Sequence, residues 1–413
     1  MRVALLSRGA HPLHPPGGLE RAVFHLAQHL RAQGVETVLL TRTPTRAGAF
    51  PGEVVAVDYG GREGAHGRIL DRTLRYPRFA LRLGEAAATR VRAGLVDVVH
   101  AQGLTALGYG RARLRDPALR APLVMSPQGM EEHKASGFRR LALVRLRALS
   151  REAARLSDRV IATDESTRGE VPHYLGVDPA RVVVLPNGID PAEIDAATPP
   201  DPDRVVRDAL PSLAGAFPIF LSVGRIEAYK GLDDIVQALD QLHRASELPA
   251  RWAWVVVGEG RDRDRLTRRV MARELVARSR GGRGIASHVH WAGHVGEGLL
   301  HALYACADVF VHSTRYEGSS LVTLEAMAHG LPVVATRAGG IPDKVSDGES
   351  GRLVEPGDVA GLARSMAELA QDAALREAMG SRGRKRAREG FGWPALAART
   401  VALYEELLRG RAR

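Results

Sequence analysis

Short apolar runs rich in valine, isoleucine and leucine alternate with longer segments of helical periodicity along most of the chain. In the segment 19–34 the apolar residues recur every three or four positions, which predicts a helix with one buried face. Strands that alternate with such helices are typical of parallel sheets covered on both faces. In the first half the runs occupy 2–7, 36–41, 53–58, 97–102, 122–127, 159–164 and 181–186. The pattern predicts an α/β fold.

The alternation restarts after a connector rich in proline and aspartate, 189–204. The later runs occupy 218–224, 252–260, 288–293, 308–313, 332–337 and 351–356. A chain of 413 residues suits two domains of about 200 residues each. We therefore predict two Rossmann-like domains, 1–195 and 196–392, followed by one amphipathic helix within 393–413.

Glycine-rich loops follow several of the predicted strands. They contain Gly17 and Gly18 in the first half, then the segment 223–231, Gly258, and the segment 317–321. Ligands of open α/β sheets collect at the carboxyl ends of strands, and glycine lets a backbone approach an anion closely. Arg225 and Lys230 lie five positions apart in one of these loops. Together the loops and the two cations indicate a diphosphate site.

Two glutamates, Glu317 and Glu325, stand eight positions apart around a predicted helix start. Ser319 or Ser320 is a suitable N-cap, so Glu317 falls in the loop and Glu325 within the first turns of the helix. A carboxylate near a helix N-terminus is suited to gripping the vicinal hydroxyls of a ribose, and the loop carboxylate could contact a sugar. The alternative is structural: Glu317 caps its own helix and Glu325 pairs with a surface arginine.

Composition and charge narrow the possible classes of protein. The chain is 45% hydrophobic and 25% charged, with no apolar run long enough to span a bilayer and no signal peptide expected at its start. Its net charge of +11 comes from arginines spread along the chain, without the interleaved aromatics of a single-strand nucleic-acid surface. The segment 138–156 alternates arginine and apolar residues and could contact an anionic membrane, although an ordinary packed helix has the same pattern. We expect a cytoplasmic protein, possible peripheral membrane contact and no nucleic-acid partner.

The second-half motifs, taken in order, resemble a known family. They are Arg225 and Lys230 in "GRIEAYKG", the pair Glu317 and Glu325, and the later segments "GLPVVATRAGGIPDKV" and "SGRLVEPGD". The chain is similar to the retaining glycosyltransferases of family 4, the glycosyl transferases group 1. That resemblance implies the GT-B architecture, in which two Rossmann-like domains face a central cleft and a C-terminal helix crosses back to the first domain.

The resemblance also implies roles for individual residues. Arg225 and Lys230 would neutralise the donor diphosphate, Glu317 would serve the donor sugar or the bond exchange, and Glu325 would bind the ribose. Donor contacts are further implied for the following residues: Ser319, Ser320, Leu321, Gly17, Gly18, Gly258 and His294. The family pattern also implies front-face transfer with retention of configuration. It implies no metal, because the basic pair neutralises the charge that a metal would otherwise neutralise.

Two features depart from the family pattern or test it. Many members carry a histidine where this chain has Gln128, which would lie with His100 near the sugar or acceptor and cannot carry charge. The strings 201–203 and 262–264 spell Asp-x-Asp, as metal-dependent transferases do, but they lie in a proline-rich connector and an arginine-rich helix. We expect no metal site at either.

The sequence therefore predicts a glycosyltransferase that moves a sugar from a nucleotide-diphosphate sugar to a saccharide, lipid-linked saccharide or small-molecule acceptor. Envelope or exopolysaccharide synthesis is the expected setting, and no cofactor besides the donor substrate is expected. Two alternatives remain open at this point. One is a sugar-nucleotide epimerase of the same fold, and the other is a sugar-nucleotide-binding protein without turnover.

Overall fold

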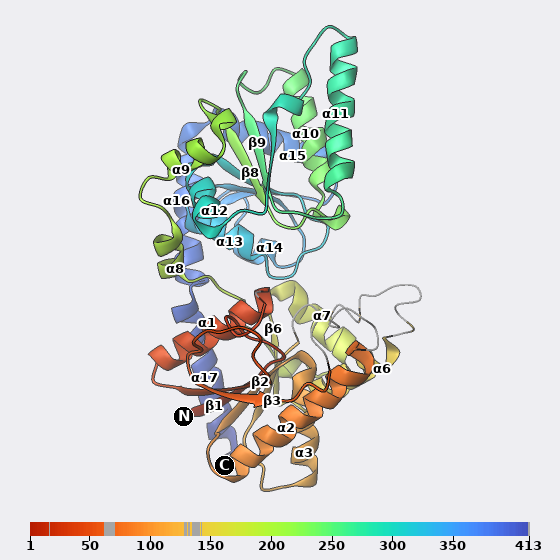
Figure 1. Cartoon of the computed structure of the whole chain (residues 1–413), viewed down its shortest axis with the longest axis vertical. Coiled ribbons are helices and arrows are strands. Elements are labelled where there is room, and N and C mark those ends of the chain that lie inside the picture. The colour runs from red at the N-terminus through yellow and green to blue at the C-terminus, as the bar shows by residue number, and fades with distance from the viewer. Residues whose placement is uncertain are drawn as a thin grey trace. The chain divides into compact units, whose positions relative to one another are not determined.

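The chain folds into two α/β units, each built on one parallel sheet (Figure 1). The computed structural model describes residues 1–15, 17–61, 71–127, 130, 133, 141 and 143–411. The first unit comprises Met1–Asn187 and Trp393–Arg413, and the second comprises Gly188–Gly392. Each of the apolar runs predicted to form a strand contains one, so the predicted α/β fold class is confirmed.

The first unit has a seven-stranded sheet in the order β3-β2-β1-β4-β5-β6-β7, and all of its strand pairs are parallel. Its strands are β1 (Arg2–Leu6), β2 (Glu36–Arg42), β3 (Glu53–Val57), β4 (Val98–Gln102), β5 (Leu123–Ser126), β6 (Arg159–Ala162) and β7 (Val182–Val184). Its main helices are α1 (Gly18–Ala32), α2 (Tyr76–Arg92), α3 (Ala106–Arg115), α6 (Val144–Leu156), α7 (Glu165–Leu175) and α17 (Trp393–Arg411).

The second unit has a six-stranded parallel sheet in the order β10-β9-β8-β11-β12-β13. Its strands are β8 (Ile219–Val223), β9 (Ala253–Val257), β10 (Val289–Gly293), β11 (Val309–His312), β12 (Val333–Thr336) and β13 (Gly351–Val354). Its helices are α8 (Pro191–Ala197), α9 (Pro202–Ala209), α10 (Leu232–Arg244), α11 (Arg263–Ser279), α12 (Glu297–Cys306), α13 (Leu321–Ala328), α14 (Ile341–Lys344), α15 (Val359–Gln371) and α16 (Ala373–Gly390).

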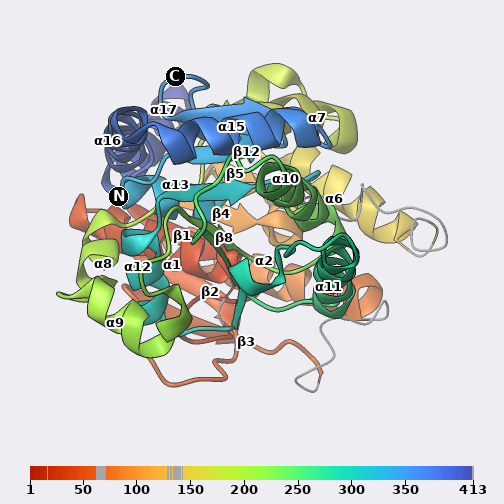
Figure 2. The same cartoon turned by 90° about the horizontal axis from the view of Figure 1, so that it is seen from above.

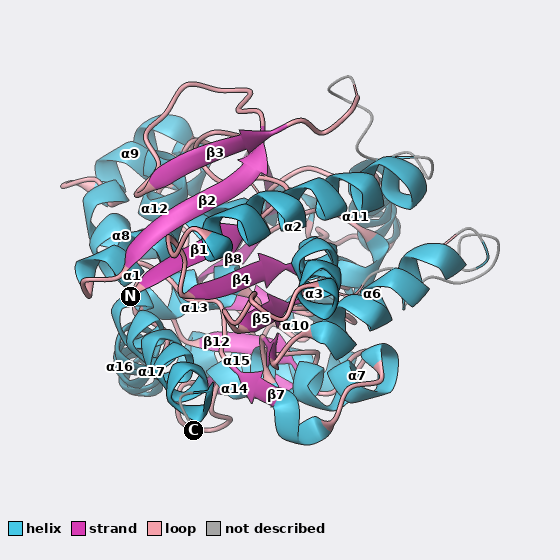
Figure 3. Cartoon of the chain, turned by 90° about the horizontal axis from the view of Figure 1, so that it is seen from below, coloured by secondary structure: helices cyan, strands magenta, loops and turns pink. Residues whose placement is uncertain are grey.

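Each sheet of the two units separates two hydrophobic cores. In β1, Ala4 and Leu6 face the core under α2 and α3, whereas Val3 and Leu5 face the core under α1 and α17. Figure 3 shows the neighbouring strands β3, β2, β1 and β4 of this sheet with α2 and α3 close by. Because side chains alternate across a strand, burial on both faces requires an almost continuous apolar run. This requirement explains why these strands could be predicted from the sequence.

The second sheet is covered in the same way. One of its cores contains residues of α10, α11 and α15, and the other contains residues of α12, α13 and α16. Helices α10 and α15, distant in sequence, lie side by side (Figure 2). In β11, Val309 and Val311 face the first of these cores and Phe310 faces the second. The covering helices leave the strand ends and their loops as the places where polar chemistry can collect.

The boundary between the units lies between Asn187 and Gly188, rather than at the predicted 195/196. Helix α8 contacts α12 and α13, and Ile194 joins the core of the second unit. Ile189 also forms a bridge with Gly392. The connector therefore begins to pack with the second unit before its proline-rich part, because its apolar residues find a core there.

In the part of the chain that the structure describes, every helix falls short of the length or the hydropathy that crossing a bilayer would require.

Candidate active site

Three glycine loops meet at the carboxyl ends of β8, β9 and β10. Gly258 has a φ of +128°, and its N–H donates to the carbonyl oxygen of Gly293 over 2.7 Å. A Cβ on Gly258 would lie 2.0 Å from the carbonyl oxygen of Gly224, so a larger residue would push the loops apart. The sequence pattern of glycine after successive strands thus reflects direct backbone packing. The close packing of the loops therefore requires glycine at position 258, whatever the outcome for the donor contact predicted there.

Arg225 lies in the loop after β8, and Lys230 is the last residue of the short 3₁₀ turn Ala228–Lys230 in that loop. One guanidinium nitrogen of Arg225 donates to the hydroxyl of Tyr229 over 2.8 Å. The ammonium of Lys230 lies 5.6 Å from the centre of the Tyr229 ring. Tyr229 therefore contacts both cations, a role that the sequence analysis did not identify. A small pocket lined in part by Gly224, Arg225 and Lys230 opens beside the turn.

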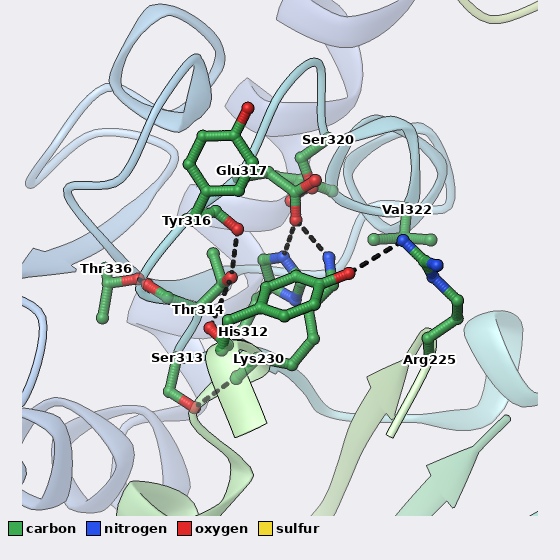
Figure 4. A network of polar contacts seen from close by, with 12 residues as sticks. Arg225, Lys230, His312, Ser313, Thr314, Tyr316, Glu317, Ser320, Val322 and Thr336 are labelled. Carbon is green, nitrogen blue, oxygen red and sulfur yellow. Dashed lines mark hydrogen bonds and ion pairs between the residues drawn. The ribbon is translucent and has the colours of Figure 1, made fainter. Parts of the chain in front are cut away.

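Glu317 is held by two groups from different strand ends. Its Oε2 lies 2.5 Å from Nζ of Lys230 and 2.8 Å from Nε2 of His312. Figure 4 shows both side chains pointing to this carboxylate. Burial opposes ionisation, but the hydrogen bond from His312 and the charge of Lys230 outweigh it and lower the pKa of Glu317 to about 2. Glu317 is thus an ionised carboxylate facing a lysine, which is not the alternative role of capping its own helix.

His312 is the site residue that sequence reasoning missed. It is the last residue of β11 and is only 5% exposed. The glycine-rich loops that indicated the site follow the strands, whereas this side chain lies at the end of the strand itself. The usable signal was a histidine at a strand end five positions before an acidic loop residue. Strand-end residues of a parallel sheet face the same region as the loop that follows.

The loop that carries Glu317 is anchored by backbone-directed hydrogen bonds. Ser313 Oγ donates to the carbonyl of Gly231 over 2.7 Å, and Thr314 Oγ1 donates to the carbonyl of Tyr316 over 2.7 Å. Gly339 has a φ of +52°, and a Cβ there would lie 1.8 Å from the carbonyl oxygen of Glu317. The position of Glu317 is therefore fixed by neighbours on both sides of the loop.

Helix α13 begins directly after this loop. Ser320 is its N-cap residue, with an extended backbone, but its side chain contacts Thr323 Oγ1 at 2.8 Å and caps no amide. Among the described residues, Ser319 Oγ is buried without a hydrogen-bond partner. The first amides of a helix have no intrahelical acceptor and favour an anion. Ser320 and Leu321 thus lie at the start of α13 and Ser319 directly before it, and the phosphate contact expected of them stays a prediction.

Glu325 occupies the next turn of α13, apart from the Glu317 cluster. Its Oε2 accepts a hydrogen bond from the hydroxyl of Tyr304 over 3.1 Å. The two glutamates thus have different partners: Glu317 pairs with cations at strand ends, and Glu325 is held by a neutral donor from α12. Their separate roles towards the donor stay a prediction.

None of the remaining predicted residues contacts the Glu317 cluster through a hydrogen bond seen among the described residues. His294 follows β10 and is exposed. Gly17 and Gly18 begin α1 of the first unit, where a Cβ on Gly17 would meet the Glu20 carboxylate at 2.4 Å. Gln128 lies outside the described residues.

His100 is buried inside the first unit. It is 2% exposed, and its nitrogens contact Tyr404 Oη at 2.6 Å and Ser126 Oγ at 2.9 Å. Burial lowers the pKa of His100 to about 4. The predicted contact with substrate would require these hydrogen bonds and this burial to be lost, so the structure argues against it.

Both Asp-x-Asp strings are used structurally. Asp201 caps α9 by accepting from the Arg204 amide over 3.0 Å. Asp262 forms an ion pair with Arg265 at 3.1 Å. These contacts give each Asp-x-Asp string a structural role that needs no metal ion.

In chemical terms, the second unit combines two cations, a partly buried carboxylate and a helix N-terminus at one sheet edge. Such a set binds an anion and stabilises charge that develops on it, because fixed positive groups need no rearrangement when the charge forms.

Comparison with known proteins agrees with this chemistry. The family described as "Glycosyl transferases group 1" matches residues 217–372, and "Glycosyltransferase Family 4" matches residues 16–193. A D-inositol 3-phosphate glycosyltransferase of Streptomyces scabiei is 32% identical over 98% of this chain and 90% of its own length. A glycogen synthase of Mycobacterium tuberculosis is 29% identical over 96% of this chain and 94% of its own length.

The fold is likewise shared with solved structures. The Anabaena protein HepE, crystallised with UDP, superposes with a TM-score of 0.70 over 98% of this chain and 100% of its own, at 19% identity. With sequence similarity over nearly the whole length and two parallel sheets of the expected type, the chain belongs to glycosyltransferase family 4 and is a glycosyltransferase of the GT-B fold.

Proposed function

We propose that this enzyme transfers a sugar from a nucleotide-diphosphate sugar to an acceptor hydroxyl with retention of configuration and without a metal. The observation that carries the proposal is the cluster at the carboxyl edge of the second sheet, where Lys230, five positions after Arg225, contacts Glu317 in the loop that leads into α13. HepE, which shares the fold, is described in complex with UDP. A diphosphate suits this edge because two cations and helix amides can share its charge.

In this proposal, Lys230 has two partners at different stages. One partner is Glu317, whose Oε2 lies 2.5 Å from the ammonium of Lys230. A bound diphosphate would compete for the same ammonium, and Glu317 would then be available to a hydroxyl of the donor sugar. As the bond between sugar and diphosphate breaks, Arg225 and Lys230 would stabilise the negative charge that grows on the leaving oxygen.

The leaving oxygen would also receive the proton of the acceptor. In front-face transfer the acceptor hydroxyl approaches from the side of the leaving group, so the departing phosphate oxygen can take its proton. The new glycosidic bond then keeps the anomeric configuration of the donor. Glu317 would stabilise the transient positive charge on the sugar by its own negative charge, since its pKa of about 2 keeps it ionised.

The acceptor and the cellular setting are proposed more broadly. The acceptor is a saccharide, a lipid-linked saccharide or a small polyhydroxy compound, and relatives named for glycogen and for inositol 3-phosphate support that range. Envelope or exopolysaccharide synthesis in the cytoplasm is proposed from the family resemblance. Peripheral membrane contact through 138–156 is proposed from its arginine pattern alone.

Calorimetry on the two glutamates tests the proposed donor site. Glu325→Ala should weaken binding of a free nucleoside diphosphate as well as of the sugar nucleotide, by about 1.5 to 3 kcal/mol for lost charge-assisted hydrogen bonds. Glu317→Ala should leave free diphosphate binding unchanged or tighter, because Lys230 loses its competing partner. Equal weakening in both variants would contradict the separate roles assigned here.

A further inference from the structure

A buried tyrosine supports the carboxylate of Glu325 from the neighbouring helix. Tyr304 on α12 is 0% exposed, and its hydroxyl lies 3.1 Å from Oε2 of Glu325. The carbonyl oxygen of Val322 is a second acceptor at 3.4 Å. A hydroxyl has one proton, so the shorter contact to a charged acceptor is the favoured hydrogen bond.

The ring of Tyr304 is fixed on several sides. It stacks on the ring of His329 with centroids 5.5 Å apart and planes at 12°, and it lies 6.0 Å from the ring of Phe310. His329 is itself hydrogen-bonded to His301, with 2.9 Å between the two ring nitrogens. A ring enclosed in this way has little rotamer freedom, so the direction of its hydroxyl is set by packing.

The hydroxyl also remains a donor. Burial raises the pKa of Tyr304 well above its usual value, and the adjacent carboxylate of Glu325 raises it further. Tyr304 therefore keeps its proton, and its hydroxyl donates a hydrogen bond to Oε2 of Glu325. Each carboxylate oxygen can accept two hydrogen bonds, so the contact with Tyr304 does not by itself saturate Oε2 of Glu325.

We propose that Tyr304 is a positioning residue that orients Glu325 to accept from the ribose hydroxyls of the nucleotide, and so contributes to selection of ribonucleotides over deoxyribonucleotides. The inference rests on the proposed function, in which Glu325 binds ribose. Its own content is that the orientation of Glu325, and not only its presence, is set by α12.

The chain offers a matched control for the loss of one buried hydroxyl. Tyr109 on α3 of the first unit is also 0% exposed, and its hydroxyl donates to the carbonyl of Ala121 over 3.0 Å. Tyr304→Phe and Tyr109→Phe each remove one oxygen and keep the ring. Both should lower the unfolding temperature modestly, whereas only the first should alter nucleotide recognition.

The experiment is calorimetry with two ligands. The probe is whichever of UDP, GDP and ADP binds the wild type most tightly, together with its 2′,3′-dideoxy counterpart. Tyr304→Phe should weaken the ribonucleotide about 3- to 10-fold, the effect of one net hydrogen bond, and leave the dideoxynucleotide within about 2-fold. Tyr109→Phe should change neither. In steady state, Tyr304→Phe should raise KM for the sugar nucleotide more than it lowers kcat.

Each other outcome overturns a specific statement. If Tyr304→Phe weakens both ligands equally, Tyr304 supports only the fold of this region and the inference fails. If Glu325→Ala loses the preference for the ribonucleotide but Tyr304→Phe keeps it, the positioning role alone fails. If Glu325→Ala keeps that preference, or if no nucleoside diphosphate binds the wild type, the proposed ribose contact fails and the inference fails with it.

Discussion

Two buried histidines, one in each unit, occupy comparable places and have different surroundings. His100 lies on β4 and His312 on β11, and each of these strands neighbours the first strand of its own sheet. His100 contacts the hydroxyls of Ser126 and Tyr404, whereas His312 contacts the carboxylate of Glu317. Burial is nearly the same, at 2% and 5% exposure.

The comparison shows that burial on a strand beside the first strand of a sheet does not by itself mark a functional histidine. The first unit uses its histidine to join β4 to β5 and to α17 through neutral hydrogen bonds. The second unit uses its histidine to hold an ionised carboxylate beside a lysine. The hydrogen-bond partner, and the charge of that partner, separates structural from functional use of a buried histidine.

The largest expected effect concerns the cations of the second unit. Lys230→Ala and Arg225→Ala should each slow turnover about 100-fold or more, as the loss of one charge-stabilising group typically does. Lys385→Ala, at an exposed position on α16, is the control and should behave like the wild type. Steady-state rates with a sugar nucleotide provide the measurement. Near-normal turnover in either site variant would remove its proposed role at the diphosphate.

The next prediction uses pH to distinguish the two units. The folded-state pKa of His100 is about 4, below its usual 6.5, so folding favours the neutral ring. Its contribution to stability is complete above pH 6.5 and is lost as pH falls towards 4. The non-titrating variant His100→Gln should therefore lose about 2 to 3 kcal/mol less than the wild type between pH 7 and 4. Chemical denaturation at the two pH values measures the difference.

The contribution of Glu317 to stability should change at a lower pH than that of His100. Its folded-state pKa of about 2 lies below the usual 4.5, so its contribution is present above pH 4.5 and is lost as pH falls towards 2. The gap in stability between wild type and Glu317→Gln should stay constant from pH 7 to 5 and shrink below 4.5. A gap that already closes near pH 6 would assign the effect to a different group.

The third prediction compares the effect on turnover of replacing each of the two histidines. His312→Gln should slow turnover about 10- to 100-fold, because Glu317 loses a charge-assisted hydrogen bond worth about 1.5 to 3 kcal/mol. His100→Gln should leave turnover within about 2-fold once the protein is folded. Rates at pH 7 with matched folded fractions compare the variants. Similar losses in both would show that the contrast between the histidines has no functional meaning.

The smallest expected effect tests whether Tyr229 helps to hold the two cations in position. Tyr229→Phe removes the 2.8 Å hydrogen bond to Arg225 but keeps the ring beside Lys230, so turnover should fall only about 2- to 10-fold. Tyr229→Ala removes both contacts and should cost more. If the two variants are equally slow, the ring contributes nothing to the position of Lys230.

The same contrast explains what the sequence could predict. The strands were readable because burial on both faces demands apolar residues, and the order of the loops placed Arg225, Lys230 and Glu317 at one sheet edge. The domain boundary was less readable, since Ile189 and Ile194 in the polar connector find apolar partners only after folding. Periodicity does not show such partners.

Side-chain partnerships were the least predictable feature. His100 was expected near the sugar or acceptor, but Tyr404, which buries it, lies 304 positions later. His312 and Tyr304 were missed for the same reason, since their contacts with Glu317 and Glu325 depend on how elements pack. A spacing in sequence indicates which groups can share an edge, but only the packing shows which of them touch.

The stereochemistry of the first product tests the central claim most directly, namely that the cations of this chain support front-face transfer from a nucleotide sugar. Proton NMR of that product, formed with excess EDTA present, reports the anomeric configuration through its coupling constant. The account predicts the donor's configuration and a rate unchanged by EDTA. An inverted product, or activity that vanishes with EDTA and returns with magnesium, would contradict it and would make Glu317 a candidate base.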